Sequence, residues 1–365
     1  MKKIVCMLVT MCTIFVMNSS IDMAMSNGIE KKMKKDEEAR IYTVEEYLYP
    51  ITPEDEEWDE LVSVEKKLEA CRIDEKILKS MTNEALIQAI IDFPFLCELF
   101  CYNSYEKGVD VMSNICDAYC ELLNRDDGKE ALVNAIDNRK STYTINKTAE
   151  QEIVDDALSL LVLYQQKFID EFDSQEVEMI SDFSSLIEFE KIADSTSYSN
   201  SNLYYYIKTP NGSFVGHYLY SCSHSSSTYH ETRDQSLVDT FGVELVRVGS
   251  CTYNCHSYAW YSQQVNPYWI PNPGIYMAYE SYYNIMSGLG SSSIYAYMGD
   301  IIFYGSVEEE RTAHSAILIS APTGAPLATR NVRSKWGASG VFEHSVSTVP
   351  SEYDTTSVSV WRRSE

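Results

Sequence analysis

The stretch Tyr253-Asn254-Cys255-His256-Ser257-Tyr258-Ala259-Trp260 decides how the second half of this chain is interpreted. The residues after the cysteine have helical character, so we expect Cys255 at or near the first turn of a helix. Free backbone N–H groups and the helix dipole favour negative charge there, which lowers the pKa of a thiol. The stretch therefore predicts a nucleophilic cysteine.

A base for this cysteine follows further along the chain. A Gly-Asp turn at Gly299-Asp300 precedes the apolar run 301–304, and His314 begins the next apolar run, 315–319. Two antiparallel strands of this kind would place His314 beside the helix that carries Cys255. A thiol and an imidazole are the two parts of a cysteine hydrolase, although a histidine at a strand end can also be satisfied by backbone contacts.

The alternative for Cys255 is a buried or disulfide-bonded cysteine. Cys251 stands four residues before it, and Cys222 is also available. A Cys222–Cys251 pair would leave Cys255 free, as an enzyme needs. One further cysteine of the mature chain would then be unpaired, and Cys71 is the candidate.

The N-terminal residues predict an exported protein. Residues 1–26 carry two lysines, a short apolar run and small residues near the end, which together indicate a signal peptide. A charged leader is expected at 27–44, and no later run is long enough for a membrane span. The net charge of −25, concentrated before Arg247, argues against nucleic acid as a partner. Solvated helix faces explain the acidic residues equally well.

Three segments are expected after the leader. Apolar residues at three- and four-residue spacing predict an acidic all-α bundle of four to six helices over 45–193, with Thr148 and Gln151 forming a capping box. A serine-rich linker and a β-hairpin follow over 194–242 and are expected to pack on the C-terminal domain. The third segment, 243–365, contains Cys255 and His314.

Four cysteines of the helical segment have regular spacing. Cys97 and Cys101, and likewise Cys116 and Cys120, would share a helix face, so nested disulfides Cys97–Cys120 and Cys101–Cys116 are predicted for an exported protein. A zinc site and simple burial of small apolar side chains are the alternatives. The histidines of the hairpin region form no metal-ligand motif and are expected on the surface or in loops; they are His217, His224 and His230.

The C-terminal motifs resemble a known superfamily. The Cys255 string, the Gly-Asp strand, His314-Ser315-Ala316-Ile317 and Ser334-Lys335-Trp336-Gly337 resemble the NlpC/P60 and CHAP papain-like cysteine hydrolases, and more closely a group of secreted Gram-positive proteins. The likeness covers about 243–353. It implies an α+β chain in which the helical domain precedes a papain-like domain, 243–365, with a central antiparallel sheet.

The resemblance also implies roles for individual residues. Cys255 matches the nucleophile and His314 the base, and a third polar residue on the strand near 327–336 would orient the imidazole. Asn331 is the candidate for that residue and Ser334 its rival. The chain departs from the superfamily at Cys255-His256-Ser257, where Cys-Ser-Gly is common, so the site is expected to take another substrate or to have altered activity.

The expected cleft and function complete these predictions. Cleft candidates are Asn254, His256, Trp269, Trp336 and His344, with core packing or a structural role as the alternative for the histidine and the tryptophans. The substrate implied is an amide bond in peptidoglycan peptides of a Gram-positive cell envelope, with no cofactor and no metal. An inactive binding or adhesion module and a transglutaminase-like acyl transferase remain the alternatives, and the oligomeric state stays open.

Overall fold

The computed structural model describes residues 43–142, 147–169, 174–181, 207–220, 224, 226–279, 282–287, 295–306, 313–320 and 325–363. The expected signal peptide, nearly all of the leader and the whole serine-rich linker lie outside these residues. Residues Glu45–Glu365 form one compact unit. The helical segment and the C-terminal segment therefore pack within the same unit, and a functional division between them stays a prediction.

Short capped helices make up the first part of this unit. Side chains of Ser63, Thr82 and Ser104 each accept a hydrogen bond from a backbone N–H in the first turn of a helix. Thr148 and Gln151 form the expected capping box. Because such start signals recur closely, the described helices are shorter and more numerous than expected: α2 Glu56–Glu60, α3 Val64–Ala70, α4 Glu75–Ser80, α5 Asn83–Ile91, η1 Leu96–Phe100, α6 Tyr105–Ile115, α7 Asp117–Leu123, α8 Gly128–Thr142, α9 Ala149–Leu163, α10 Gln166–Ile169 and α11 Ser174–Ser181.

A large antiparallel sheet forms the second part. Its strand order is β3-β8-β7-β6-β5-β9-β4, and all its pairs are antiparallel. The strands are β3 Glu244–Arg247, β4 Tyr282–Ser287, β5 Ile301–Tyr304, β6 His314–Leu318, β7 Asn331–Lys335, β8 Val341–Ser345 and β9 Val358–Arg363. The expected meander is present, because β5 pairs with β6 and places Tyr304 opposite His314. The chain is thus of the mixed α+β class.

The remaining elements lie around this sheet. They are the hairpin β1 Ile207–Lys208 and β2 Phe214–Val215, the helices α12 Tyr229–Phe241 and α13 Gly274–Tyr279, the π-helical turn η2 Ser257–Tyr261, and the 3-10 turn η4 Leu327–Thr329. The hairpin region contacts the C-terminal segment through the backbone bridge between Tyr218 and Trp269.

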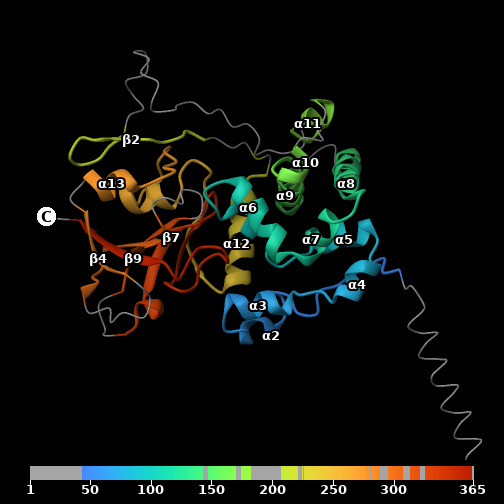
Figure 1. Ribbon diagram of the computed structural model, residues 1–365, viewed down its shortest axis with the longest axis horizontal. Helices are drawn as coiled ribbons and strands as arrows, with labels where there is room; N and C mark the ends of the chain where they lie inside the picture. Colours follow the sequence, from blue (N-terminus) through green and yellow to red (C-terminus); the bar gives the residue numbers. More distant parts are fainter. Residues whose placement is uncertain are drawn as a thin grey trace, which may run out of the picture. The chain divides into compact units, whose positions relative to one another are not determined.

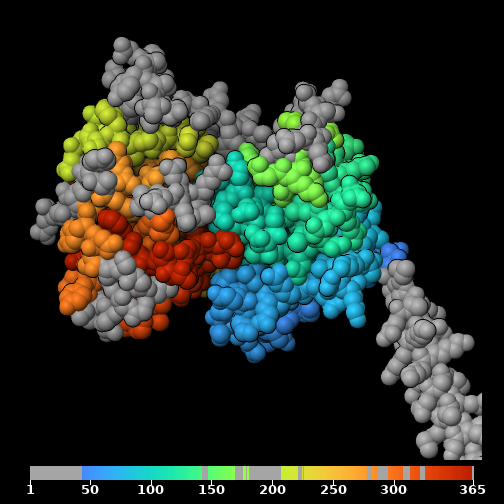
Figure 2. Space-filling view, viewed as in Figure 1, coloured from blue at the N-terminus to red at the C-terminus, as the bar shows by residue number. Residues whose placement is uncertain are grey.

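Helix α12 joins the two parts. It lies between the helices and the sheet (Figure 1), and packs on α9, η1 and β3. Trp58 Nε1 donates to the backbone oxygen of Thr240 at its C-terminal end, and Phe241 packs edge-on against Trp336. The C-terminal residues also meet the helical residues directly (Figure 2), where Ser351 N and Oγ both donate to Glu98 Oε1.

The predicted nested disulfides are absent, and that prediction is wrong. Cys97, Cys101, Cys116 and Cys120 are all free thiols. Cys97 lies in a 3-10 turn that Cys101 ends, and in such a turn side chains repeat every three residues, so positions four apart do not share a face. Cys116 breaks the helix between α6 and α7 with an extended backbone, and Cys120 is exposed.

The other cysteines follow the predictions more closely. Cys71 and Cys255 are free, as expected. Cys251 is disulfide-bonded, whereas Cys222, the partner expected for it, lies outside the described residues. Cys255 is therefore not consumed by a disulfide.

Candidate functional site

Cys255 is the first helical residue of the segment that continues into η2. The preceding residue, Asn254, caps this helix, because its Oδ1 accepts from the backbone N–H of Ser257 at 3.1 Å. The same oxygen accepts from the N–H of Ile270 at 3.2 Å, and Asn254 Nδ2 donates to the Ile270 carbonyl at 2.7 Å. Asn254 thus fixes the cysteine between two chain segments.

The Cys255 helix packs on one face of the sheet at β6. Ser315 Oγ accepts from Trp260 Nε1 at 2.8 Å and lies 2.8 Å from His256 Nδ1. Between His256 and Trp260 in the chain, Tyr258 packs against Ile317. These contacts place the thiol at the beginning of β6.

The Cys255 thiol is fully buried, with 0% of the residue exposed. Its Sγ lies 3.4 Å from Asn103 Oδ1. Burial raises its pKa to about 12, although the backbone N–H of Ser315 and the charge of Lys335 oppose that rise. The resting site therefore holds a protonated thiol, in contrast to the thiolate expected from a helix N-terminus.

His314 is also fully buried. Its ring stacks on Tyr353 with centroids 4.3 Å apart, and burial together with the nearby His344 and His256 holds its pKa well below the usual range. Both ring nitrogens lack a hydrogen-bond partner among the described residues. The imidazole is therefore neutral and unpartnered.

Cys255 and His314 share neighbours among the described residues. The sulfur meets the backbone of Ser315, the residue next to His314, and Tyr353 is an electrostatic neighbour of Cys255 as well as the stacking partner of His314. Side chains alternate along a strand, so Ser315 faces the Cys255 helix while His314 faces Tyr353. Within the described part of the chain, no hydrogen bond links the thiol to the imidazole.

Neither candidate for the third residue bonds to His314. Asn331 is exposed at the start of β7. Ser334 Oγ is buried and lies 2.7 Å from His344 Nε2, while it also accepts from Trp336 Nε1 at 3.0 Å. The Ser334-Lys335-Trp336 string thus ties β7 to β8 and packs the interior.

The predicted cleft residues lie in the interior. Asn254, His256 and Trp336 are fully buried, and His344 and Trp269 nearly so. Trp269 packs with Cys251 and Ala338, which is the core-packing alternative. None of these side chains lines an open surface beside Cys255.

Sequence reasoning missed Asn103, which lies between η1 and α6. It contacts Cys255, Asn254 and His256, and its Nδ2 donates to the carbonyl of Ala313 at 2.8 Å. About 150 residues separate Asn103 from the cysteine, and no local pattern marks it.

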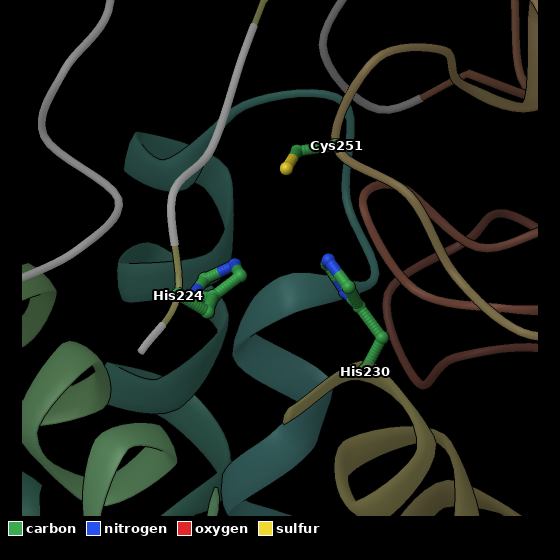
Figure 3. A group of neighbouring side chains, drawn as sticks. All are labelled: His224, His230 and Cys251. Carbon is green, nitrogen blue, oxygen red and sulfur yellow. The ribbon is translucent and has the colours of Figure 1, made fainter. Parts of the chain in front are cut away.

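A second cluster consists of His224, His230 and Cys251, which point toward one another (Figure 3); their ligand atoms lie within 4.8 Å. Cys251 is disulfide-bonded and offers no thiolate. Arg233 adds positive charge, and burial together with this charge lowers the pKa of His224 to about 4 and of His230 to about 2. A disulfide and a neighbouring guanidinium do not suit a cation, so the cluster is a structural one.

No helix of the described residues is long and apolar enough to cross a membrane. Comparisons with family models, curated proteins and solved structures found no significant match to this chain.

Proposed function

We propose that this chain is an exported cysteine hydrolase of papain-like type that cleaves amide bonds. One observation carries the proposal: a free thiol at the first turn of a helix packs at the beginning of β6, where His314 has a buried imidazole with two unpartnered nitrogens. A buried polar group without a partner requires an explanation, and a catalytic base is one.

The reaction assigned to these groups begins with proton transfer from Cys255 to neutral His314. The thiolate attacks the amide carbonyl, the backbone N–H of Cys255 and a neighbouring donor stabilise the oxyanion, and His314 returns the proton to the departing amine. Water then attacks the thioester, His314 accepts its proton, and the thiol is restored. Catalytic hydrogen bonds often tighten only when substrate binds, so the reaction requires the imidazole to approach the sulfur.

The substrate class rests on the resemblance alone. The likeness to cell-envelope hydrolases suggests peptide bonds of peptidoglycan in a Gram-positive envelope, and one fold hosts many reactions. Neither Asn331 nor Ser334 is given a role in the reaction, because neither contacts His314.

Digestion of purified Gram-positive sacculi by the mature protein tests this proposal. Soluble muropeptides are expected from the unmodified protein, and Cys255→Ala and His314→Ala are each expected to lower their release by at least about 10³-fold. Cys120→Ala removes an exposed free thiol and should leave release unchanged. Undiminished release by Cys255→Ala would sink the thiol mechanism.

A binding or adhesion module without catalysis is the second candidate. The full burial of Cys255 and its raised pKa favour this function, since neither suits a nucleophile. Binding of the protein to sacculi without release of any muropeptide, unchanged in Cys255→Ala, would select it over the hydrolase.

A further inference from the structure

Asn103 belongs to the helical part of the chain and yet lies in the Cys255 site. It immediately precedes Ser104, the residue that caps α6, so the start of that helix fixes its backbone. Its side chain reaches two separate segments of the sheet part, the start of the Cys255 helix and the carbonyl of Ala313 before β6. The site is therefore assembled from both parts of the molecule.

Hydrogen bonding determines which way the Asn103 amide faces. Asn254 Oδ1 accepts from two backbone N–H groups, so Asn254 Nδ2 must donate, and it donates to Asn103 Oδ1 at 3.0 Å. Asn103 Nδ2 in turn donates to the carbonyl of Ala313, which can only accept. The amide oxygen, and not the NH₂ group, thus faces the sulfur of Cys255.

This orientation has two consequences. The contact with Asn103 would lower the pKa of the Cys255 thiol if the NH₂ group faced the sulfur. Because the amide oxygen faces it, Asn103 Oδ1 accepts from the S–H of Cys255, and an acceptor in this position stabilises the thiol against the thiolate. The second N–H of Asn103 faces His256 Nε2 at 3.2 Å, so that nitrogen accepts and His256 Nδ1 donates to Ser315 Oγ. All four hydrogen bonds of the Asn103 amide are made.

We propose that Asn103 is a positioning residue of the Cys255 site, through which the helical part holds the thiol protonated and covered. The proposal deepens the proposed function and rests on it: the hydrolase would work only after this amide moves or a substrate amide takes its place. The helical part then restrains the nucleophile.

Other groups near the Cys255 sulfur also affect whether the thiol is protonated. Lys335 on β7 lies close enough to favour the thiolate, and Tyr353, which precedes β9, is an electrostatic neighbour. His314 and His256 are neutral because burial holds their pKa values low. None of these groups accepts the thiol proton in the resting site, which leaves that role to Asn103.

Alkylation of Cys255 by iodoacetamide, followed by mass spectrometry across a range of pH, tests the proposal. In the unmodified protein Cys255 is expected to react slowly and the exposed Cys120 quickly. Asn103→Ala removes the acceptor, so Cys255 should react at least tenfold faster and its pH midpoint should fall. Asn103→Asp keeps an oxygen beside the sulfur and adds negative charge, so the midpoint should stay at or above that of the unmodified protein.

The matched control is Asn83→Ala. Asn83 on α5 also makes hydrogen bonds through both ends of its amide, to Asp127 and Arg125, but far from the cysteine in sequence. The Asn83→Ala substitution removes these hydrogen bonds within the helical part but no contact of the Cys255 site. The rate of Cys255 alkylation should therefore not change. If Asn103→Ala does not fold, as judged by circular dichroism, Asn103→Ser takes its place, because a serine hydroxyl is too short to reach the sulfur.

Three results would overturn the proposal: an unchanged rate in Asn103→Ala, equal acceleration by Asn83→Ala, or a lowered midpoint in Asn103→Asp. Muropeptide release is scored separately. If release does not depend on Cys255, the hydrolase fails while alkylation still decides the role of Asn103.

Discussion

At the scale of single residues, Lys335 is a buried amine with three backbone partners. It is fully buried, and its Nζ donates to the carbonyls of Ser250, Gly337 and Ser339 at 2.9, 2.9 and 2.6 Å. The ammonium also lies 4.7 Å from the centroid of the Tyr253 ring. It therefore closes the turn after β7 onto the loop that leads to Cys255.

Lys335→Met is expected to lower the free energy of unfolding by about 3 kcal/mol. The substitution keeps the length of the side chain but leaves three buried carbonyls unpaired, at about 1–3 kcal/mol each, partly offset because a buried charge is removed. Urea unfolding at pH 7 measures the change. Lys66→Met, which removes one exposed ion pair with Glu69, should stay within about 0.5 kcal/mol. Equal effects of both variants would contradict this account of Lys335.

At the scale of elements, the turn between β7 and β8 connects the sheet to η1. Ala338 N donates to the carbonyl of Phe100 at 3.1 Å. Gly337 has φ of 48°, and a Cβ there would lie 2.5 Å from the carbonyl oxygen of Tyr102. The two backbones can approach this closely only because residue 337 has no side chain.

Gly337→Ala is therefore expected to destabilise the protein by more than positive φ alone explains. Gly212→Ala is the matched control, because Gly212 also has positive φ, 93°, but nothing lies within 4 Å of its Cβ position. The control should cost about 1 kcal/mol, the typical penalty for a left-handed residue with a Cβ, and Gly337→Ala about 3 kcal/mol or more in urea unfolding. Equal losses of unfolding free energy in Gly337→Ala and Gly212→Ala would disprove the close contact with η1.

The elements that the sequence predicted are those with local signals. The Gly-Asp turn, the paired strands β5 and β6 and the capping box of α9 each follow from residues within a few positions of one another. The placement of Asn103 on Cys255 has no such signal, since a contact across 152 residues depends on how whole elements pack. The same limit explains the cysteines, because a segment as short as Leu96–Phe100 does not reveal from its apolar residues whether it repeats every three residues, as a 3-10 turn does, or every 3.6, as an α-helix does.

At the scale of the whole molecule, burial of titratable groups sets the pH range of stability. Burial lowers the pKa of His256 to about 3 and of His344 to about 4, and raises the pKa of Cys71, Cys116 and Cys255 to about 12 each. Burial also raises the pKa of the two remaining buried thiols, Cys97 and Cys101. The ordinary values are 6.5 for histidine and 9.0 for cysteine. The buried histidines and thiols are therefore neutral over a wider pH range in the folded protein than in the unfolded chain.

The change of stability with pH has opposite signs in acid and in alkali. Below pH 6.5 the histidines of the unfolded chain bind protons, whereas the buried histidines of the folded protein stay neutral, so stability is lost as the pH falls toward 4. Above pH 9 the unfolded chain releases protons that the buried thiols keep, so stability is lost as the pH rises toward 12. Lys335, with a pKa lowered to about 7, acts in the opposite direction between pH 7 and 10.5. It is one group against five thiols.

We therefore expect maximal stability between about pH 7 and 9, and a steep loss between pH 9 and 11. Each buried thiol contributes about 1.4 kcal/mol per pH unit while its folded pKa stays above the pH, and Lys335 cancels one of the five up to about pH 10.5. Urea unfolding at pH 8, 9, 10 and 11 measures the slope, which Cys116→Ala should reduce by about 1.4 kcal/mol per unit. Cys120→Ala removes an exposed thiol and should leave it unchanged. A flat profile above pH 9, or equal slopes in both variants, would show that the buried thiols do not set the alkaline limit.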